Sequence, residues 1–391
     1  MSELDNLIKD RNKFKVLVID DKPVMRKTIR NMLRVLGLNA CYEAEDGEQA
    51  LKKLRAERFD FLICDWNMPR MNGYDLLLNI RKDNRLKHLP FLMVTAEVEE
   101  STVAQAIESD VDGYIIKPFV PNLLEEKIIE ILTSKIEPSE VDTQIQLAEI
   151  LMKAGRFGNA HHELDKAEQI VPRSPKVHYT RGLIYERQGR IDLAEKSFSQ
   201  AREMGPLFIK AREKLAEIYK NTNKFNKMIE VLKEAVEVSP KNADRQIELG
   251  KALLSVGRNQ EAKRAFNQAL EVEPDNAYMK TQIGEAYLAK GLAQDAENAF
   301  KSAIKSNPDE VYTYNRLGIA FRRQKKYEEA IDNYKRALKI QPEEEKLLYN
   351  LARAYLEAGQ EKEALASIKK ALEIQPQFKE AREFLAKIKK P

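Results

Sequence analysis

Short apolar runs alternate with stretches of helical spacing over the first 135 residues. The runs predict five β-strands, at Phe14–Ile19, Leu38–Ala44, Phe59–Cys64, Pro90–Val94 and Gly113–Ile116. Apolar residues with helical spacing predict helices at 23–36, 47–54, 74–80, 102–109 and 121–132. Strands that alternate with helices in this way form a parallel sheet that is covered on both faces. We therefore predict an α/β domain over residues 1–135, with a doubly wound five-stranded parallel sheet.

A second pattern begins after residue 141 and repeats every 34 residues. Proline marks the period, at positions 138, 172, 206, 240, 274, 308, 342 and 376. Small residues recur in a first helix at 148, 182, 216, 250, 284, 318 and 352, and alanine recurs in a second helix at 167, 201, 235, 269, 303, 337 and 371. A fixed period of this length predicts an all-α solenoid of stacked helix pairs. We assign a linker to residues 136–141, seven helix pairs to 142–378 and a capping helix to 379–391.

Polar residues stand where four of the predicted strands end. Asp20 and Asp21 follow the first strand, Asp65 the third, Thr95 the fourth and Lys117 the fifth. Because the carboxyl ends of parallel strands share one edge, we expect these side chains to meet there. Three clustered carboxylates suit Mg²⁺, and the Asp65 carboxylate is then a candidate nucleophile towards phosphorus. Taken singly, each residue could instead cap a helix, form a turn or lie in solvent.

The motifs around these residues resemble the receiver domain of two-component response regulators. They comprise Asp20-Asp21, Asp65-Trp66-Asn67-Met68-Pro69, Gly73, Thr95-Ala96 and Lys117-Pro118-Phe119. The resemblance covers residues 13–133 and implies that Asp65 accepts a phosphoryl group from a sensor histidine kinase or a phosphotransfer protein. It also implies a set of site roles: Mg²⁺ ligands at Asp20, Asp21, Asp65 and the Asn67 carbonyl, phosphoryl contacts from Thr95 and from Lys117 with a cis bond to Pro118, and a switch formed by Thr95 and Tyr114. The pair Asn67 and Glu97 resembles that of faster-hydrolysing members, which implies a short-lived acyl phosphate.

The 34-residue units resemble tetratricopeptide repeats over residues 141–378, and arrays of this family bind peptides on a concave face. In the later units, the positions that face this groove in the family hold Tyr278, Leu288, Tyr312, Asn315, Ile319, Arg322, Arg323, Tyr349, Arg353 and Leu356. Tyr, Leu and Arg with little acid suit a peptide that bears apolar and acidic side chains. The same residues could instead be core and solvated surface. Glu285 occupies one position of the clamp by which some members bind terminal carboxylates, so chaperone tails are not expected partners.

The units depart from the repeat pattern at one position. Near the start of the first helix, where the family usually has an aromatic residue, stand Gln144, His178, Arg212, Gln246 and Lys280, and only Tyr314 fits. We expect this departure to leave the fold unchanged.

Composition narrows the possible functions further. The chain has 66 Lys and Arg against 62 Asp and Glu, and its formal charge of +4 gives no reason to expect a nucleic-acid or membrane partner. Cys41 and Cys64 lack metal-ligand spacing and fit reduced, buried thiols. The N-terminal sequence does not resemble a signal peptide, and no apolar run has membrane-spanning length. We expect a cytoplasmic protein.

These observations predict a response regulator whose output is protein binding. Phosphorylation of Asp65 would modulate the binding of a protein or peptide by the repeat array. We do not expect an enzyme beyond the phosphorylation and dephosphorylation of the receiver, and no DNA-binding domain follows the linker. In the alternative hypothesis, the array is a constitutive scaffold or adaptor and the receiver serves localisation or dimerisation.

Overall fold

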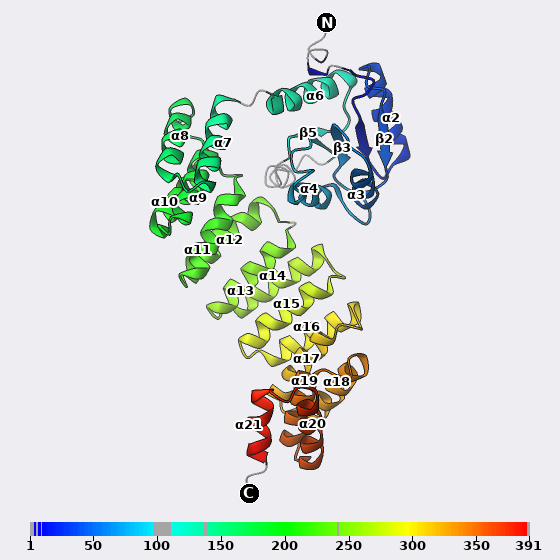
Figure 1. Cartoon of the computed structure of the whole chain (residues 1–391), viewed down its shortest axis with the longest axis vertical. Helices are drawn as coiled ribbons and strands as arrows, with labels where there is room; N and C mark the ends of the chain where they lie inside the picture. The colour runs from blue at the N-terminus through cyan, green and yellow to red at the C-terminus, as the bar shows by residue number, and fades with distance from the viewer. Residues whose placement is uncertain are drawn as a thin grey trace. The chain divides into compact units, whose positions relative to one another are not determined.

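The computed structural model describes residues 4, 7, 8, 10–96, 111–136, 139–240 and 242–388 (Figure 1). Glu97, the predicted helix 102–109 and positions 137–138 of the predicted linker lie outside the described residues. By its internal contacts, the chain divides into two compact units, Met1–Pro240 and Lys241–Pro391. Within the described residues, no helix is both long and apolar enough to cross a membrane.

A five-stranded parallel sheet forms the first part of the unit Met1–Pro240. Its strands are β1 (Val16–Ile19), β2 (Cys41–Ala44), β3 (Phe61–Asp65), β4 (Phe91–Thr95) and β5 (Gly113–Ile116), in the spatial order β2-β1-β3-β4-β5. All neighbouring pairs are parallel. The helices described alongside them are α2 (Pro23–Val35), α3 (Gly47–Ala56), α4 (Gly73–Lys82) and α6 (Pro121–Ile136). The predicted doubly wound α/β fold is therefore confirmed.

The sheet separates two hydrophobic cores because successive strand residues point to opposite faces. On one face, Val16 and Val18 of β1 pack in a cluster with residues of α2 and α6. On the other face, Leu17 and Ile19 pack in a cluster with residues of α3 and α4 (Figure 1). Every residue of β1 and β3 is buried, which explains why these strands read as continuous apolar runs.

Helix pairs make up the rest of both units. The first unit contains α7 (Glu140–Lys153), α8 (Phe157–Ile170), α9 (Pro175–Arg187), α10 (Ile191–Met204), α11 (Ile209–Asn221) and α12 (Phe225–Val238). The second contains α13 (Ala243–Ser255), α14 (Asn259–Val272), α15 (Ala277–Ala289), α16 (Ala293–Ser306), α17 (Val311–Arg323), α18 (Tyr327–Ile340), α19 (Glu345–Glu357), α20 (Glu361–Ile374) and α21 (Lys379–Ile388). The predicted array of helices after the sheet is confirmed, and α7 begins inside the segment 136–141 that we assigned to a linker.

Glycine in the first helix of several pairs lets the second helix approach closely. A methyl group at Gly182, Gly250 or Gly284 would lie about 2.5 Å or less from the ring of the phenylalanine sixteen positions later. At Gly318 the ring it would meet belongs to Tyr334. The small residues at this period therefore serve packing, as the sequence pattern predicts.

The position that departs from the repeat pattern is buried and polar. His178, Arg212, Gln246 and Lys280 each expose less than a tenth of their surface. The Arg212 Nε donates a hydrogen bond to Glu234 at 3.0 Å, and the Lys280 Nζ donates to the Ser306 hydroxyl at 2.8 Å. Hydrogen bonds thus offset part of the cost of burying Arg212 and Lys280 where the family has aromatic rings. The His178 ring nitrogens and the Gln246 amide oxygen have no hydrogen-bond partner among the described residues.

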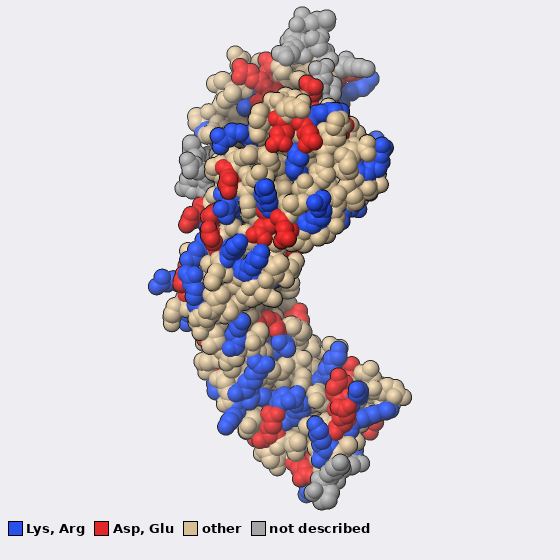
Figure 2. All heavy atoms as spheres, turned by 90° about the vertical axis from the view of Figure 1, so that its left-hand side faces the viewer, with Lys and Arg blue, Asp and Glu red and all other residues tan. Residues whose placement is uncertain are grey.

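Charged side chains of both signs are interspersed over the face that Figure 2 shows. This distribution agrees with the small formal charge of the chain. A functional site must therefore be sought in local groups of side chains, because the net charge of the chain does not indicate one.

Candidate functional site

The ends of four strands, β1, β3, β4 and β5, bring the candidate residues to one edge of the sheet. In the register of β1 and β3, Ile19 lies beside Cys64, so the next residues, Asp20 and Asp65, are neighbours. In the register of β4 and β5, Thr95 lies beside Ile116, so Lys117 follows at the same edge. The parallel arrangement therefore produces the convergence that the sequence predicts.

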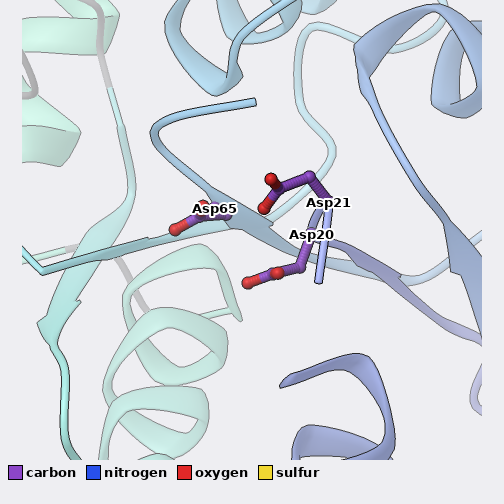
Figure 3. A group of neighbouring side chains, drawn as sticks. All are labelled: Asp20, Asp21 and Asp65. Carbon is purple, nitrogen blue, oxygen red and sulfur yellow. The ribbon is translucent and has the colours of Figure 1, made fainter. Parts of the chain in front are cut away.

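Three carboxylates form a compact cluster at this edge (Figure 3). Each of Asp20, Asp21 and Asp65 offers a carboxylate oxygen, and these atoms lie within 4.8 Å of one another. The Lys117 Nζ lies 2.7 Å from the Asp65 Oδ1 and 2.9 Å from the Asp20 Oδ2. Asp20 and Asp65 are buried, so water screens these charges weakly.

The electrostatics of the cluster favour the uptake of positive charge. Burial raises the pKa of the Asp65 carboxyl, the Lys117 ammonium opposes the rise, and the charges of Asp20 and Asp21 add to it. For Lys117, burial lowers the pKa, but its hydrogen bonds to Asp65 and Asp20 outweigh this and raise it. One ammonium therefore balances only part of the negative charge of three carboxylates.

A divalent cation that prefers oxygen ligands fits these residues. The Asp21 Oδ1 is buried and has no hydrogen-bond partner among the described residues. An orphaned carboxylate oxygen beside two further carboxylates is the donor set of a hard cation such as Mg²⁺. The three aspartates are thus candidate metal ligands.

The comparisons with known proteins agree with this geometry. Residues 16–129 match the family model of the response regulator receiver domain. Over 117 residues the chain is 50% identical to the chemotaxis protein CheY of Pseudomonas aeruginosa, which covers 30% of this chain and 94% of that protein. The chain belongs to the response regulators. It is likewise 50% identical over 117 residues to CheY-3 of Vibrio cholerae, with 30% and 90% covered.

Family models also match the helical part of the chain. A solved structure of the response regulator CheY4 of Vibrio cholerae is 32% identical, covers 30% of this chain and 97% of that chain, and gives a TM-score of 0.29. Tetratricopeptide repeat models match residues 145–207 and 321–388, and a model described as the cytochrome c-type biogenesis protein H TPR domain matches 214–348. An N-terminal receiver domain followed by tetratricopeptide repeats is therefore confirmed.

The remaining predicted residues of the receiver domain lie on or beside the same strands. Thr95 is buried at the end of β4, and its carbonyl accepts a hydrogen bond from the Lys117 backbone N–H at 2.7 Å. The peptide bond between Lys117 and Pro118 is cis. Asn67 is exposed two residues after Asp65, and Tyr114 of β5 exposes 37% of its surface.

The loop that follows Asp65 is held by contacts that the sequence did not reveal. Gly73 begins α4 so close to β3 that a methyl group there would lie 2.2 Å from the Asp65 carbonyl oxygen. Arg70 adopts a left-handed φ of 64° and pairs with Glu45 at 2.8 Å and with Asp46. Asp46 also caps α3 by accepting a hydrogen bond from the Gln49 backbone N–H at 2.8 Å. The β3–α4 loop is thus tied to the start of α3 beside Asp65.

The predicted groove residues of the repeats do not share one environment. Tyr278 and Tyr312 are exposed, by 72% and 52%. Four others, Ile319, Arg322, Arg323 and Arg353, line one cavity of about 300 Å³. The Asn315 amide oxygen accepts a hydrogen bond from the Asn350 amide at 2.8 Å, and Tyr349 packs against Phe378 and Phe384. Leu288 is buried, and Leu356 exposes 36% of its surface.

Proposed function

We propose that Asp65 accepts a phosphoryl group from a phosphohistidine of a sensor kinase or phosphotransfer protein. The observation that carries this proposal is the cluster of Asp20, Asp21 and Asp65 with the Lys117 ammonium in contact with two of them. A carboxylate is a nucleophile for phosphoryl transfer when nearby positive charge stabilises the transferred oxygens.

The transfer exchanges one bond to phosphorus for another. A carboxylate oxygen of Asp65 forms the O–P bond while the P–N bond to the donor imidazole breaks, and its electron pair stays on the imidazole nitrogen, which takes a proton. The Lys117 ammonium, 2.7 Å from Asp65, neutralises negative charge on the phosphoryl oxygens. Bound Mg²⁺, held by Asp20, Asp21, Asp65 and the Asn67 carbonyl, would supply further neutralisation. Beyond gaining and losing this group, the proposal assigns the chain no enzymatic activity.

The test is the mass of the intact chain after incubation with phosphoramidate, a small donor that also contains a P–N bond. We expect one added phosphoryl group in the wild type with Mg²⁺, and none with a chelator or in Asp65→Asn. Asp60→Asn is the matched control, because Asp60 precedes the same strand at its opposite end and accepts a hydrogen bond from the Lys15 backbone. Undiminished labelling of Asp65→Asn would show that another residue is the acceptor.

We infer further that the repeat array binds a protein and that phosphorylation changes this binding. Support comes from the short connection, since α6 ends at Ile136 and α7 begins at Glu140. The connection is short enough for the receiver to contact the repeats. Phosphorylation changes the conformation of the repeats only if the phosphorylated and unphosphorylated receiver interact with them differently.

Hydrogen exchange across residues 141–240 tests this coupling, with beryllofluoride as the phosphoryl mimic and Asp65→Asn as the control that cannot respond. We expect a change in exchange in the wild type alone. If hydrogen exchange is unchanged, and if the affinity for a partner is the same in the wild type and in Asp65→Asn, the results would support the constitutive scaffold instead.

A further inference from the structure

The cavity of about 300 Å³ in the unit Lys241–Pro391 carries an excess of positive charge. It lies between α17 and α19 and is lined by Ile319, Arg322, Arg323, Asn350, Arg353 and Glu357. Three guanidinium groups therefore share a small space with one carboxylate. Such an arrangement is costly unless further negative charge is brought to it.

Two residues of this region differ from those at the same repeat positions of the neighbouring units. Arg322 stands where three other units have Leu254, Leu288 and Leu356. Tyr334 stands where other units have phenylalanine, at 198, 266 and 300, or an aliphatic residue. The Tyr334 position is apolar in every other unit, so packing does not explain its hydroxyl. The Arg322 position is apolar in both neighbouring units, at Leu288 and Leu356, and charged in two earlier units, at Glu186 and Lys220.

These two departures are in the same place. Only 8% of the Arg322 side chain is exposed, and its guanidinium pairs with both oxygens of Glu357. Tyr334 is fully buried beneath Gly318, and no described residue gives its hydroxyl a hydrogen bond of regular geometry. Burial raises the pKa of Tyr334 to about 12, against the influence of Arg322 and Arg353. The hydroxyl therefore lies close to the charged residues of the cavity.

The remaining guanidiniums differ in what they contact. Arg323 donates a hydrogen bond to the Leu288 carbonyl. Arg353 lies over the Tyr349 ring, 5.8 Å from its centroid, and has no carboxylate partner among the described residues. Arg353 is thus the group in the cavity whose charge is least compensated.

We propose that this cavity binds the carboxylate of an aspartate or glutamate side chain in an extended segment of a partner protein, with Arg353 as its principal contact. The proposal rests on the proposed function of the array as a protein-binding domain. Arg322 and Glu357 form the wall of the site, and the exposed Tyr312 of the same unit offers apolar surface to neighbouring residues of the segment. Charge complementarity identifies the acidic partner.

The test measures fluorescence anisotropy of the full-length protein with two labelled peptides, one of repeated leucine, serine and glutamate and one with glutamine replacing glutamate. We expect the glutamate peptide to bind at least about tenfold tighter, the factor that corresponds to one well-placed charge pair. Arg353→Gln should abolish this preference. Lys339→Gln, which removes one positive charge from an exposed position of α18, should retain it.

A second variant separates binding from folding. Arg322→Leu with Tyr334→Phe restores the residues that other units use, so its thermal stability should equal or exceed that of the wild type while the preference for glutamate falls. The proposal is overturned by equal affinity for both peptides, by no binding of either, by equal losses in Arg353→Gln and Lys339→Gln, or by stronger competition from a phosphoserine peptide. If only the glutamine peptide binds, the proposed protein-binding function stands and only the proposal of a carboxylate-binding cavity is refuted. Phosphorylation of Asp65 is measured in a separate experiment.

Discussion

Removal of the Lys117 ammonium should destabilise the receiver domain, and Mg²⁺ should restore much of the loss. In Lys117→Met, the fully buried Asp20 carboxylate and that of Asp65 lose the ammonium that lies 2.9 and 2.7 Å away. Loss of one partner from a buried ion pair costs about 3–5 kcal/mol. Because 14% of the Lys117 side chain reaches solvent, we expect a value near the lower end, about 3 kcal/mol.

Asp65→Asn should have the opposite effect. The raised pKa of Asp65 means that the folded domain disfavours the ionised carboxylate, mainly because the carboxylate is buried. Neutralising it should therefore stabilise the metal-free domain. Mg²⁺ at a hundred times its dissociation constant adds about 2.7 kcal/mol to a protein that binds it only when folded. At one fixed Mg²⁺ concentration, the gain should be larger in Lys117→Met and smaller in Asp65→Asn than in the wild type, because the affinity for Mg²⁺ should rise in the first variant and fall in the second.

Urea unfolding followed by tryptophan emission measures all three proteins. Trp66 is the single tryptophan of the chain, exposes 6% of its surface and adjoins Asp65, so its emission reports on this domain. The reasoning is refuted if Lys117→Met loses less than about 1 kcal/mol without Mg²⁺. A destabilised Asp65→Asn, or an equal gain from Mg²⁺ in all three proteins, would refute it as well.

Three further predictions concern other parts of the chain. The Glu297 pKa is lowered from its ordinary value of 4.5 to about 2, because hydrogen bonds from Lys301, Lys326 and Gln324 outweigh the effect of burial. Its contribution of about 3 kcal/mol should be complete above pH 4.5 and disappear as the pH falls to 2, so acid unfolding curves of the wild type and Glu297→Gln should converge there. Gly73→Ala should displace the Asp65 backbone, cost about 1–3 kcal/mol and reduce phosphoryl uptake, whereas Gly158→Ala, with no atom near the added methyl group, should leave uptake unchanged. Arg70→Gln should remove the pairing with Glu45 and the buried Asp46, and hydrogen exchange of residues 66–72 should then rise; unchanged exchange would show that the loop is held by other contacts.

The sequence predicts the sheet well because each strand is a distinct apolar run. The strand β5 has the predicted bounds, Gly113–Ile116, and β3 ends at Asp65, one residue beyond the predicted limit. The prediction for β2 began too early, at Leu38, because the residue is buried in the core before the strand pairing starts at Cys41. The helix α6 continues to Ile136, past the predicted end at Leu132, since no proline or glycine interrupts it.

The part of the candidate site that depends on the order of the strands in the sheet could be predicted from the sequence. Strand ends of a parallel sheet share one edge, so Asp65 and Lys117 could be placed together although 52 positions separate them. The pairing of Arg70 with Asp46 joins two loops, and no periodicity or motif specifies such a contact. The proximity of Tyr334 to Arg322 depends on the close helix approach at Gly318, which a pattern of small residues suggests but does not locate.

The aspartate cluster at the sheet edge and the arginine cavity are governed by the same electrostatics with opposite signs. In each, charges of one sign outnumber their partners, three carboxylates against Lys117 and three guanidiniums against Glu357. Neither arrangement is needed for folding, since buried ion pairs contribute less than apolar packing of similar volume. A surplus of one charge destabilises the protein while the site is empty, and it raises the affinity of the site for the opposite charge. Binding of the ligand therefore restores stability to the folded protein. The positions where this chain departs from efficient packing are therefore the positions at which a cation or an acidic partner should be sought first.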